Sequence, residues 1–221
     1  YMQTQRSLIV LLRFSAVCVL FLCMAQVSCN QRGKTGVIIF MITDMEGVAG
    51  VFNHEDYTYQ DGRFHDKARY LTTQEVNAAV EGAFDGGAGK VVVLDGHGSG
   101  ALNPEELHPD AILVAGGGYD FTTLIDSSFD AACMIGQHAM IHAPGGNMDH
   151  SWSSRTINGA WLNGEPIGEI GVNTIVAGYF NVPMIFLSGD TAACVEMNTL
   201  VPEAVTVAVK VAARVPTTTA T

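Results

Sequence analysis

Five short apolar runs, each bounded by glycine, aspartate or proline, constrain the fold more than any other feature of the sequence. They are nearly continuous in apolar residues, which is typical of strands that are covered on both faces. Apolar side chains at helical spacing follow the first run, over Lys67–Phe84, and a second predicted helix covers Ile167–Phe180. Strands that alternate with helices favour the α/β class, with a mostly parallel central sheet flanked by helices. The predicted strands are Val37–Thr43, Lys90–Asp95, Ala111–Ala115, Ala131–Gly136 and Pro183–Ser188.

The sequence also predicts one small element outside this sheet. The pair Asn163–Gly164 predicts a hairpin near residues 155–166, because Asn-Gly adopts the backbone of a tight two-residue turn. A chain of 221 residues is long enough to bury a sizeable core. We therefore expect a leader over residues 1–29 and a single α/β domain over residues 35–215.

The first 29 residues are typical of a targeting segment. Arg6 and Arg13 precede an apolar run of signal-peptide length, and small residues follow that run. Cys29 also loosely matches the cleavage site of a bacterial lipoprotein. We expect an exported protein, periplasmic or extracellular, with a lipid on Cys29 as an alternative and membrane attachment through the leader only.

Charge and cysteine content exclude several functional classes. The formal net charge is −11, which disfavours nucleic acid or an anionic membrane surface as a partner and fits cation binding. Only Cys133 and Cys194 lie outside the leader. They predict neither a disulfide framework nor a cysteine zinc site, and we expect both thiols to be buried and inert.

Two carboxylates, Asp44 and Glu46, follow the first predicted strand. In an extended chain this spacing directs both side chains to the same side, where they repel each other. The arrangement is costly unless a cation or a hydrogen-bond donor neutralises it. A solvated acidic turn at the end of the strand is the alternative interpretation.

Further polar side chains follow other predicted strands. His97 and His138 come directly after the second and fourth predicted strands, Glu169 lies at a predicted helix start, and His150 ends a glycine-rich loop. The carboxyl ends of parallel strands meet at one edge of a sheet, so we expect these groups to converge. Imidazole nitrogen and carboxylate oxygen are ligands of zinc and similar divalent ions, and a cluster of this size can hold two.

Each of these residues also has a structural interpretation. A lone histidine in a glycine loop, such as His97, is more often a turn residue than a ligand. The glycines of "DGHGSG" do not open a helix, so they do not predict a phosphate loop. The sequence has no G-x-S-x-G motif of the kind used by serine hydrolases. We expect surface or structural roles for His54, His65, His108 and His142.

The ordered set of motifs resembles the bacterial D-aminopeptidase family of binuclear zinc peptidases. The likeness extends over roughly residues 37–209, and its strength lies in the order and spacing of six motifs rather than in any one of them. The motifs are "TDMEG", "DGH", "LHPDA", "GQHA", "DHSW" and "GEIGVNTIVAGYFNVPMIFLSGD".

The resemblance implies a function and a set of site residues. It implies hydrolysis of small peptides from the N-terminus with a preference for D-amino acids, two zinc ions per subunit and a ring-like homo-oligomer. It also implies that the family's C-terminal segment is missing from this chain. His150 falls on a histidine regarded as catalytic, and Asp44 falls on a bridging ligand. The implied metal ligands are Asp44, Glu46, His97, His138 and Glu169.

Two other functions fit parts of the same pattern. A binuclear metal phosphoesterase also uses aspartate, histidine and glutamate, but it needs basic residues for phosphate, and Arg155 is almost alone in the relevant loops. A non-catalytic extracytoplasmic protein that binds metal or peptide would share the leader and the acidic character. An activity assay separates this second alternative from a peptidase.

Overall fold

A six-stranded parallel sheet forms the centre of the molecule, as the sequence predicts. The computed structural model describes residues 36–116 and 120–212. The sheet has the order β3-β2-β1-β4-β7-β8, and every neighbouring pair is parallel. Its strands are β1 (Val37–Thr43), β2 (Ala88–Asp95), β3 (Ile112–Val114), β4 (Ala131–Gln137), β7 (Met184–Asp190) and β8 (Val205–Lys210).

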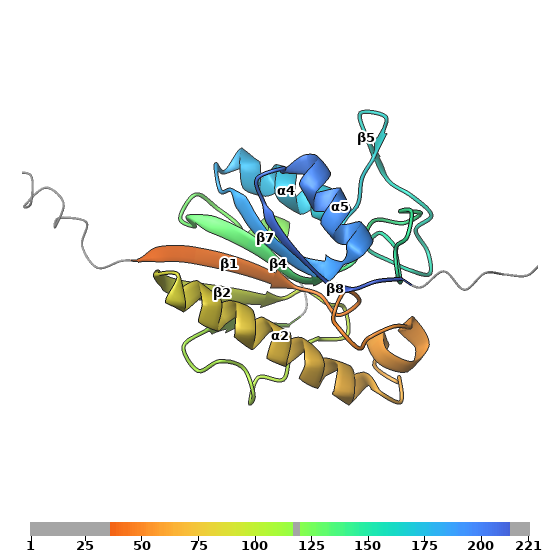
Figure 1. Cartoon of the computed structure of the whole chain (residues 1–221), viewed down its shortest axis with the longest axis horizontal. Helices are drawn as coiled ribbons and strands as arrows, with labels where there is room; N and C mark the ends of the chain where they lie inside the picture. Colours follow the sequence, from red (N-terminus) through yellow and green to blue (C-terminus); the bar gives the residue numbers. More distant parts are fainter. Residues whose placement is uncertain (1–35, 117–119, 213–221) are drawn as a thin grey trace, which may run out of the picture. The chain divides into compact units, whose positions relative to one another are not determined.

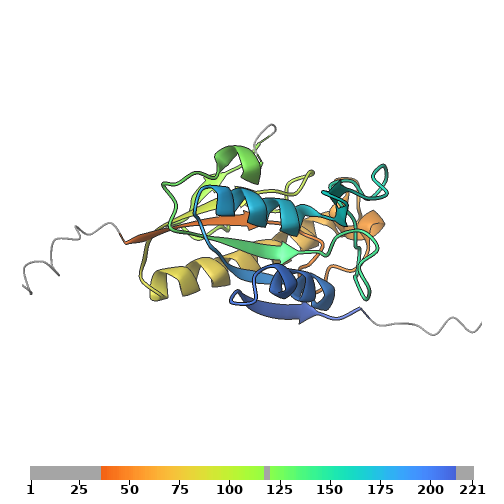
Figure 2. The same ribbon diagram turned by 90° about the horizontal axis from the view of Figure 1, so that it is seen from above.

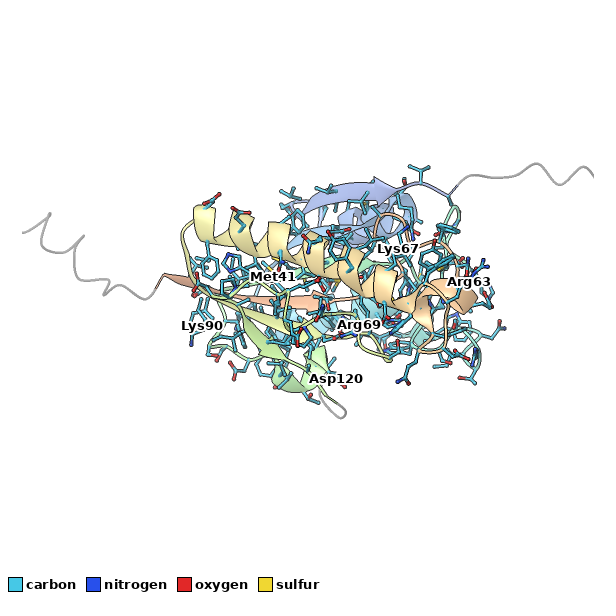
Figure 3. The ribbon with its side chains drawn as sticks, turned by 90° about the horizontal axis from the view of Figure 1, so that it is seen from below. Met41, Arg63, Lys67, Arg69, Lys90 and Asp120 are labelled. Atoms are coloured by element: carbon cyan, nitrogen blue, oxygen red, sulfur yellow. The ribbon has the colours of Figure 1, made fainter. Side chains whose placement is uncertain are left out.

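Helices cover both faces of this sheet, which is why its central strands are apolar throughout. α2 (His65–Asp85) packs on one face, and α3 (Phe121–Leu124), α4 (Glu169–Tyr179) and α5 (Thr191–Leu200) pack on the other (Figure 1). Successive β1 side chains alternate between the two layers. Met41 lies beneath α2 (Figure 3), whereas Phe40 joins the opposite cluster. The predicted helices over 67–84 and 167–180 are confirmed as α2 and α4.

The strand order determines where a site can form. Counted along the chain, the six sheet strands are arranged 3-2-1-4-5-6, so the chain direction across the sheet reverses between β1 and β4. Doubly wound sheets of this order bind ligands in the crevice beyond the carboxyl ends of the strands at that reversal. Figures 1 and 2 both show the short π-helix η1 (His54–Thr58) and the loop with the hairpin at that end of the sheet.

The predicted hairpin is confirmed but is shorter than expected. It consists of β5 (Trp161–Leu162) and β6 (Glu165–Pro166), paired antiparallel. Asn163 and Gly164 form its turn with φ angles of 54° and 91°, as a tight turn with two left-handed residues requires.

Three further expectations concern the cysteines and the leader. Cys133 and Cys194 are buried and free, as predicted, and burial raises the pKa of the Cys133 thiol to about 12. The expected leader, residues 1–29, lies outside the described residues. Among the helices in residues 36–116 and 120–212, none has the length and apolarity needed to cross a membrane.

Candidate metal centre

The site lies where the loop after β1 meets the end of β4. The Asp44 N–H donates to the Ile135 carbonyl at 2.8 Å, and the Gly47 N–H donates to the Gly136 carbonyl at 2.7 Å. A Cβ atom on Gly47 would lie only 2.1 Å from the Gln137 carbonyl oxygen. Glycine is therefore required at position 47 for this loop to lie against β4, and the close approach brings the β1 carboxylates to the β4 end.

Asp44, Glu46 and His97 form the first half of the site, which we call the Glu46 half. His97 Nδ1 lies 3.1 Å from Asp44 Oδ1 and 3.1 Å from Glu46 Oε2. Its other ring nitrogen, Nε2, is 2.9 Å from the Thr58 carbonyl oxygen. Because a carbonyl can only accept, Nε2 carries the proton of the neutral ring, and Nδ1 keeps its lone pair for a ligand.

The second half consists of Asp44, His138 and Glu169, and we call it the His138 half. His138 Nε2 lies 3.2 Å from Asp44 Oδ2 and 3.6 Å from Glu169 Oε1. Its Nδ1 lies 2.8 Å from the Ala139 carbonyl oxygen, so the lone pair of the neutral ring is on Nε2. Asp44 therefore presents one carboxylate oxygen to each half, in the arrangement expected of a bridging ligand.

The spacing of the ligand atoms in both halves fits divalent metal ions. Tetrahedral zinc, with bonds of about 2.0–2.2 Å, places neighbouring ligand atoms about 3.3–3.6 Å apart. Three buried atoms of the cluster have no aligned hydrogen-bond partner among the described residues: Glu46 Oε2, His138 Nε2 and Glu169 Oε2. Buried polar atoms rarely lack a partner, and an ion is one explanation. Metal-ligating histidines also usually donate their second N–H to a carbonyl, as His97 and His138 do.

The charges of the cluster are strongly coupled. Burial would raise the pKa of Asp44, but its contacts with His138 and His97 lower that pKa well below its usual value. Burial opposes charge on His138, yet Asp44 and Glu169 raise its pKa well above the ordinary value. In the protein without an ion, protons on the histidines therefore neutralise part of the carboxylate charge. A divalent cation can replace those protons.

His150 lies directly against the His138 half. Its ring stacks on that of His138, with centroids 3.8 Å apart and an interplanar angle of 18°. Its Nδ1 is 2.9 Å from the Met148 carbonyl oxygen, so Nε2 of the neutral ring is free to accept a proton. His138, His150 and Glu169 also offer ligand atoms within 4.8 Å of one another. The structure therefore brings all six predicted site residues together, and the catalytic role of His150 remains a prediction.

One further histidine lies at the edge of the site. His54, expected to be a surface or structural residue, lies with Nδ1 3.7 Å from Glu46 Oε1 and its ring 5.3 Å from that of His150. It belongs to η1, whose N-cap is Asn53, and not to the loop after a strand. By contrast, His65 is buried with Nδ1 3.0 Å from the Tyr57 carbonyl oxygen, which is the structural role that we expected.

Lys210 supports the Glu46 half from the edge strand β8. Its ammonium group donates to the Glu46 carbonyl and, at 2.7 Å, to the Val51 carbonyl. Burial lowers the pKa of Lys210 to about 8. Nothing in the sequence identified this contact, because it depends on the pairing of β8 with β7.

An open cavity of about 490 Å³ extends outward from the cluster. Five of the six site residues line it, namely Asp44, Glu46, His97, His150 and Glu169. Tyr59, Asp61 and Arg155 also line the cavity. This volume falls within the range of small-molecule sites, so the cavity can accommodate a small ligand beside the cluster.

The comparisons with known proteins point to a single family. The sequence matches a family model described as Peptidase_M55: D-aminopeptidase, over residues 38–219. The D-aminopeptidase of Bacillus subtilis (strain 168) is 36% identical over 177 residues. The solved structure of the Zn-dependent D-aminopeptidase DppA from Bacillus subtilis, described as a self-compartmentalizing protease, is similar with a TM-score of 0.72 and 31% identity. Each comparison covers 78% of this chain and 63% of the relative, so the chain spans less than two thirds of the relatives' length.

Proposed function

The chain belongs to the D-aminopeptidase family, and from this premise we propose that it is a zinc-dependent aminopeptidase. Its substrates are small peptides with an N-terminal D-amino acid. The observation that carries the proposal is the convergence of three carboxylates and two imidazoles around Asp44, with buried ligand atoms that have no aligned partner in the described part of the chain. The relative of known structure is named as a zinc-dependent D-aminopeptidase.

The cluster offers ligands for two zinc ions. Glu46 and His97 would hold one ion, His138 and Glu169 would hold the other, and Asp44 would be shared. When bound, zinc supplies Lewis acidity for the scissile carbonyl and lowers the pKa of water from 15.7 to about 7.

The side chains of the protein supply orientation and proton transfer. The carboxylates of the cavity wall attract the free ammonium group of a peptide N-terminus. The Met148 carbonyl fixes the His150 ring through Nδ1, so Nε2 can take up a proton and return it to the leaving amine. Histidine is the side chain that most often acts as a general acid and base, and His150 would have this role here.

The same cavity wall disfavours the phosphoesterase alternative. Among the described residues of this wall, Arg155 is the single arginine or lysine. A phosphoesterase needs basic residues to bind phosphate, and this wall offers almost none. A binding protein without activity is the remaining alternative.

A hydrolysis assay tests the proposal. Matched D-alanyl and L-alanyl peptides are incubated with the full chain, with and without added zinc. We expect zinc-dependent release of alanine that is faster from the D-alanyl peptide. Absence of hydrolysis in protein shown by elemental analysis to carry zinc would contradict the proposed activity and favour a binding protein.

We also propose that the protein forms a ring-like homo-oligomer. The relative is described as self-compartmentalizing, and large apolar side chains are exposed around a groove of about 580 Å³ between the hairpin and the helices α4 and α5. Among them are Leu162, Ile175 and Val195. Light scattering coupled to size-exclusion chromatography tests this proposal, and a monomer at micromolar concentration would contradict it.

The cellular location is a separate proposal. We propose that residues 1–29 direct export, on the composition of that segment alone. Mass spectrometry of the expressed protein tests this. A mature chain that begins near Cys29 supports export, lipid on Cys29 indicates anchoring, and an intact segment on a cytoplasmic protein contradicts the proposal.

A further inference from the structure

The outer part of the cavity has one positive charge that the metal centre does not use. Arg155 lines the same cavity as Asp44, Glu46 and Glu169. Within residues 36–116 and 120–212, no aspartate or glutamate forms an ion pair with it. An arginine without an acidic partner, in a wall that is otherwise acidic, can bind an anionic group of a ligand.

An aromatic ring, and not a carboxylate, holds the guanidinium group of Arg155 in place. Its Cζ lies 3.8 Å from the centroid of the Tyr59 ring, in a cation–π contact. The Tyr59 hydroxyl lies 3.1 Å from Ser154 Oγ, which links the ring to the loop that carries Arg155. Stacking fixes the plane of the guanidinium group, so its N–H fork remains available at the edge.

Arg63 provides an internal comparison, because it also stacks on an aromatic ring. Its Cζ lies 4.7 Å from the centroid of Phe64. However, Arg63 Nε is 2.8 Å from Asp56 Oδ1, and Arg63 is not part of the cavity wall, whereas Arg155, also exposed, lines the cavity. Figure 3 shows Arg63 at the outer edge of the molecule, at the end opposite Lys90. Stacking on an aromatic ring is thus common to both arginines, and the missing acidic partner is specific to Arg155.

We propose that Arg155 binds the C-terminal carboxylate of the substrate, so that the preferred substrates are short peptides with a free α-carboxylate. This inference rests on the proposed peptidase function and adds a specificity residue to it. Arginine pairs with carboxylates through two parallel hydrogen bonds. Successive peptide residues advance by about 3.3–3.6 Å, so only a short peptide can place its ammonium group at the acidic wall and its carboxylate at Arg155 within one cavity.

The first test measures binding to the full chain after removal of metal with a chelator, which excludes hydrolysis. The probes are D-alanyl-D-alanine and D-alanyl-D-alaninamide, which differ in the carboxylate alone, and the method is titration calorimetry. A hydrogen bond between charged groups contributes enough to change affinity by about 10- to 100-fold. We expect wild type and Arg63→Gln to bind the free acid tighter than the amide by this factor, Arg155→Gln to bind both equally, and Arg155→Lys to lie between.

The second test measures hydrolysis with zinc present. For the free acid, Arg155→Gln should raise KM by about 10- to 100-fold with kcat nearly unchanged, because the contact is the same in the bound substrate and the transition state. For the amide, neither KM nor kcat should change. If Arg155 had a purely structural role, its replacement would alter the kinetics of both substrates.

The two tests separate this inference from the proposed function. Equal binding of the acid and the amide by wild type, or equal effects of Arg155→Gln and Arg63→Gln, overturns the role of Arg155. If the wild type prefers the acid through Arg155 but hydrolyses neither peptide with zinc, the carboxylate site stands and the peptidase function fails.

Discussion

The two halves of the candidate metal centre share Asp44 but differ in the segments of the chain that supply their other residues. In the Glu46 half, Asp44 and Glu46 come from a single short loop, and His97 follows the neighbouring strand β2. In the His138 half, the ligands come from the end of β4 and the start of α4, with a long loop between them. The Glu46 half is therefore assembled mostly by local chain geometry. The His138 half depends on how that long loop folds.

Each half also has one accessory histidine, and the two are oriented differently. His54 Nδ1 lies 3.2 Å from Thr58 Oγ1 and 3.7 Å from Glu46 Oε1, so the nitrogen that faces the cluster already has neighbours. His150 uses Nδ1 for a backbone carbonyl and leaves Nε2 without a hydrogen bond to the described residues. The difference favours His150 over His54 as the residue for the proposed proton transfer. Four changes test this comparison.

The largest effect is expected for Asp44→Asn, because Asp44 presents an oxygen to both halves. We expect bound zinc to fall from two ions per chain to nearly none, and the rate to fall to that of the metal-free protein. Elemental analysis of the purified variant measures the first, and hydrolysis of a D-alanyl peptide measures the second. Glu46→Gln is the control, since it should lose one ion only. Equal zinc content in the two variants would refute the bridging role.

His138→Ala should have the next largest effect, and it separates the halves. It removes a ligand with 1% side-chain exposure and leaves the carboxylates of Asp44 and Glu169 without their imidazole partner. We expect one ion to be lost. Metal affinity should fall further than the factor of about 10 to 100 that is typical when a residue that only contacts a metal ligand is changed. Zinc titration measures the affinity. In the matched variant His97→Ala, the ion of the Glu46 half should be the one lost. Loss of both ions from either variant would show that the halves do not bind independently.

His150→Ala should lower the rate by about 10²- to 10⁴-fold, the usual contribution of a positioned general acid or base. The loss should appear in kcat, because the group acts on charge that develops only in the transition state. Zinc content should stay at two ions per chain, since both halves keep their ligands. Kinetics and elemental analysis on the same preparation decide between a proton-transfer role and a ligand role. Loss of zinc together with activity would make His150 a third ligand of the His138 half.

The smallest effect is expected for His54→Ala. An ion pair at the distance of His54 from Glu46 contributes about 0.2–1 kcal/mol, so the rate should change by less than about tenfold. Burial lowers the pKa of His54, which further weakens the charged contact. Steady-state kinetics of this variant beside His150→Ala provide the measurement. A rate loss for His54→Ala as large as that for His150→Ala would remove the proposed difference between the two halves.

The buried strands at the centre of the sheet were predictable from their composition. Every side chain of β4 is buried, and such strands appear as continuous apolar runs. β8, which was missed, lies at the edge of the sheet and none of its side chains is fully buried, so burial does not require a continuous apolar run there. α5 was missed because it follows β7 without a connecting loop, with Asp190 as its N-cap. Both misses concern the β7–β8 edge of the sheet.

The site residues were predictable where they follow strand ends. Asp44, Glu46, His97 and His138 lie within a few residues of a predicted strand, and convergence there is a consequence of parallel topology. His54 and Lys210 were not predictable in this way. The first is placed by a π-helix held by its cap, and the second by the pairing of a strand that the sequence pattern did not indicate.

The position of Glu169 changes what the crevice can attract. Glu169 is the first residue of α4, and the helix N-terminus has a partial charge of about +0.5 that ordinarily draws anions. In other sheets with this strand order, the N-terminus of a helix at the crevice binds a pyrophosphate. In this protein the helix α4 places its own carboxylate, that of Glu169, at its N-terminus. A helix end that can bind an anion in other proteins thus offers a ligand for the proposed metal ions in this one.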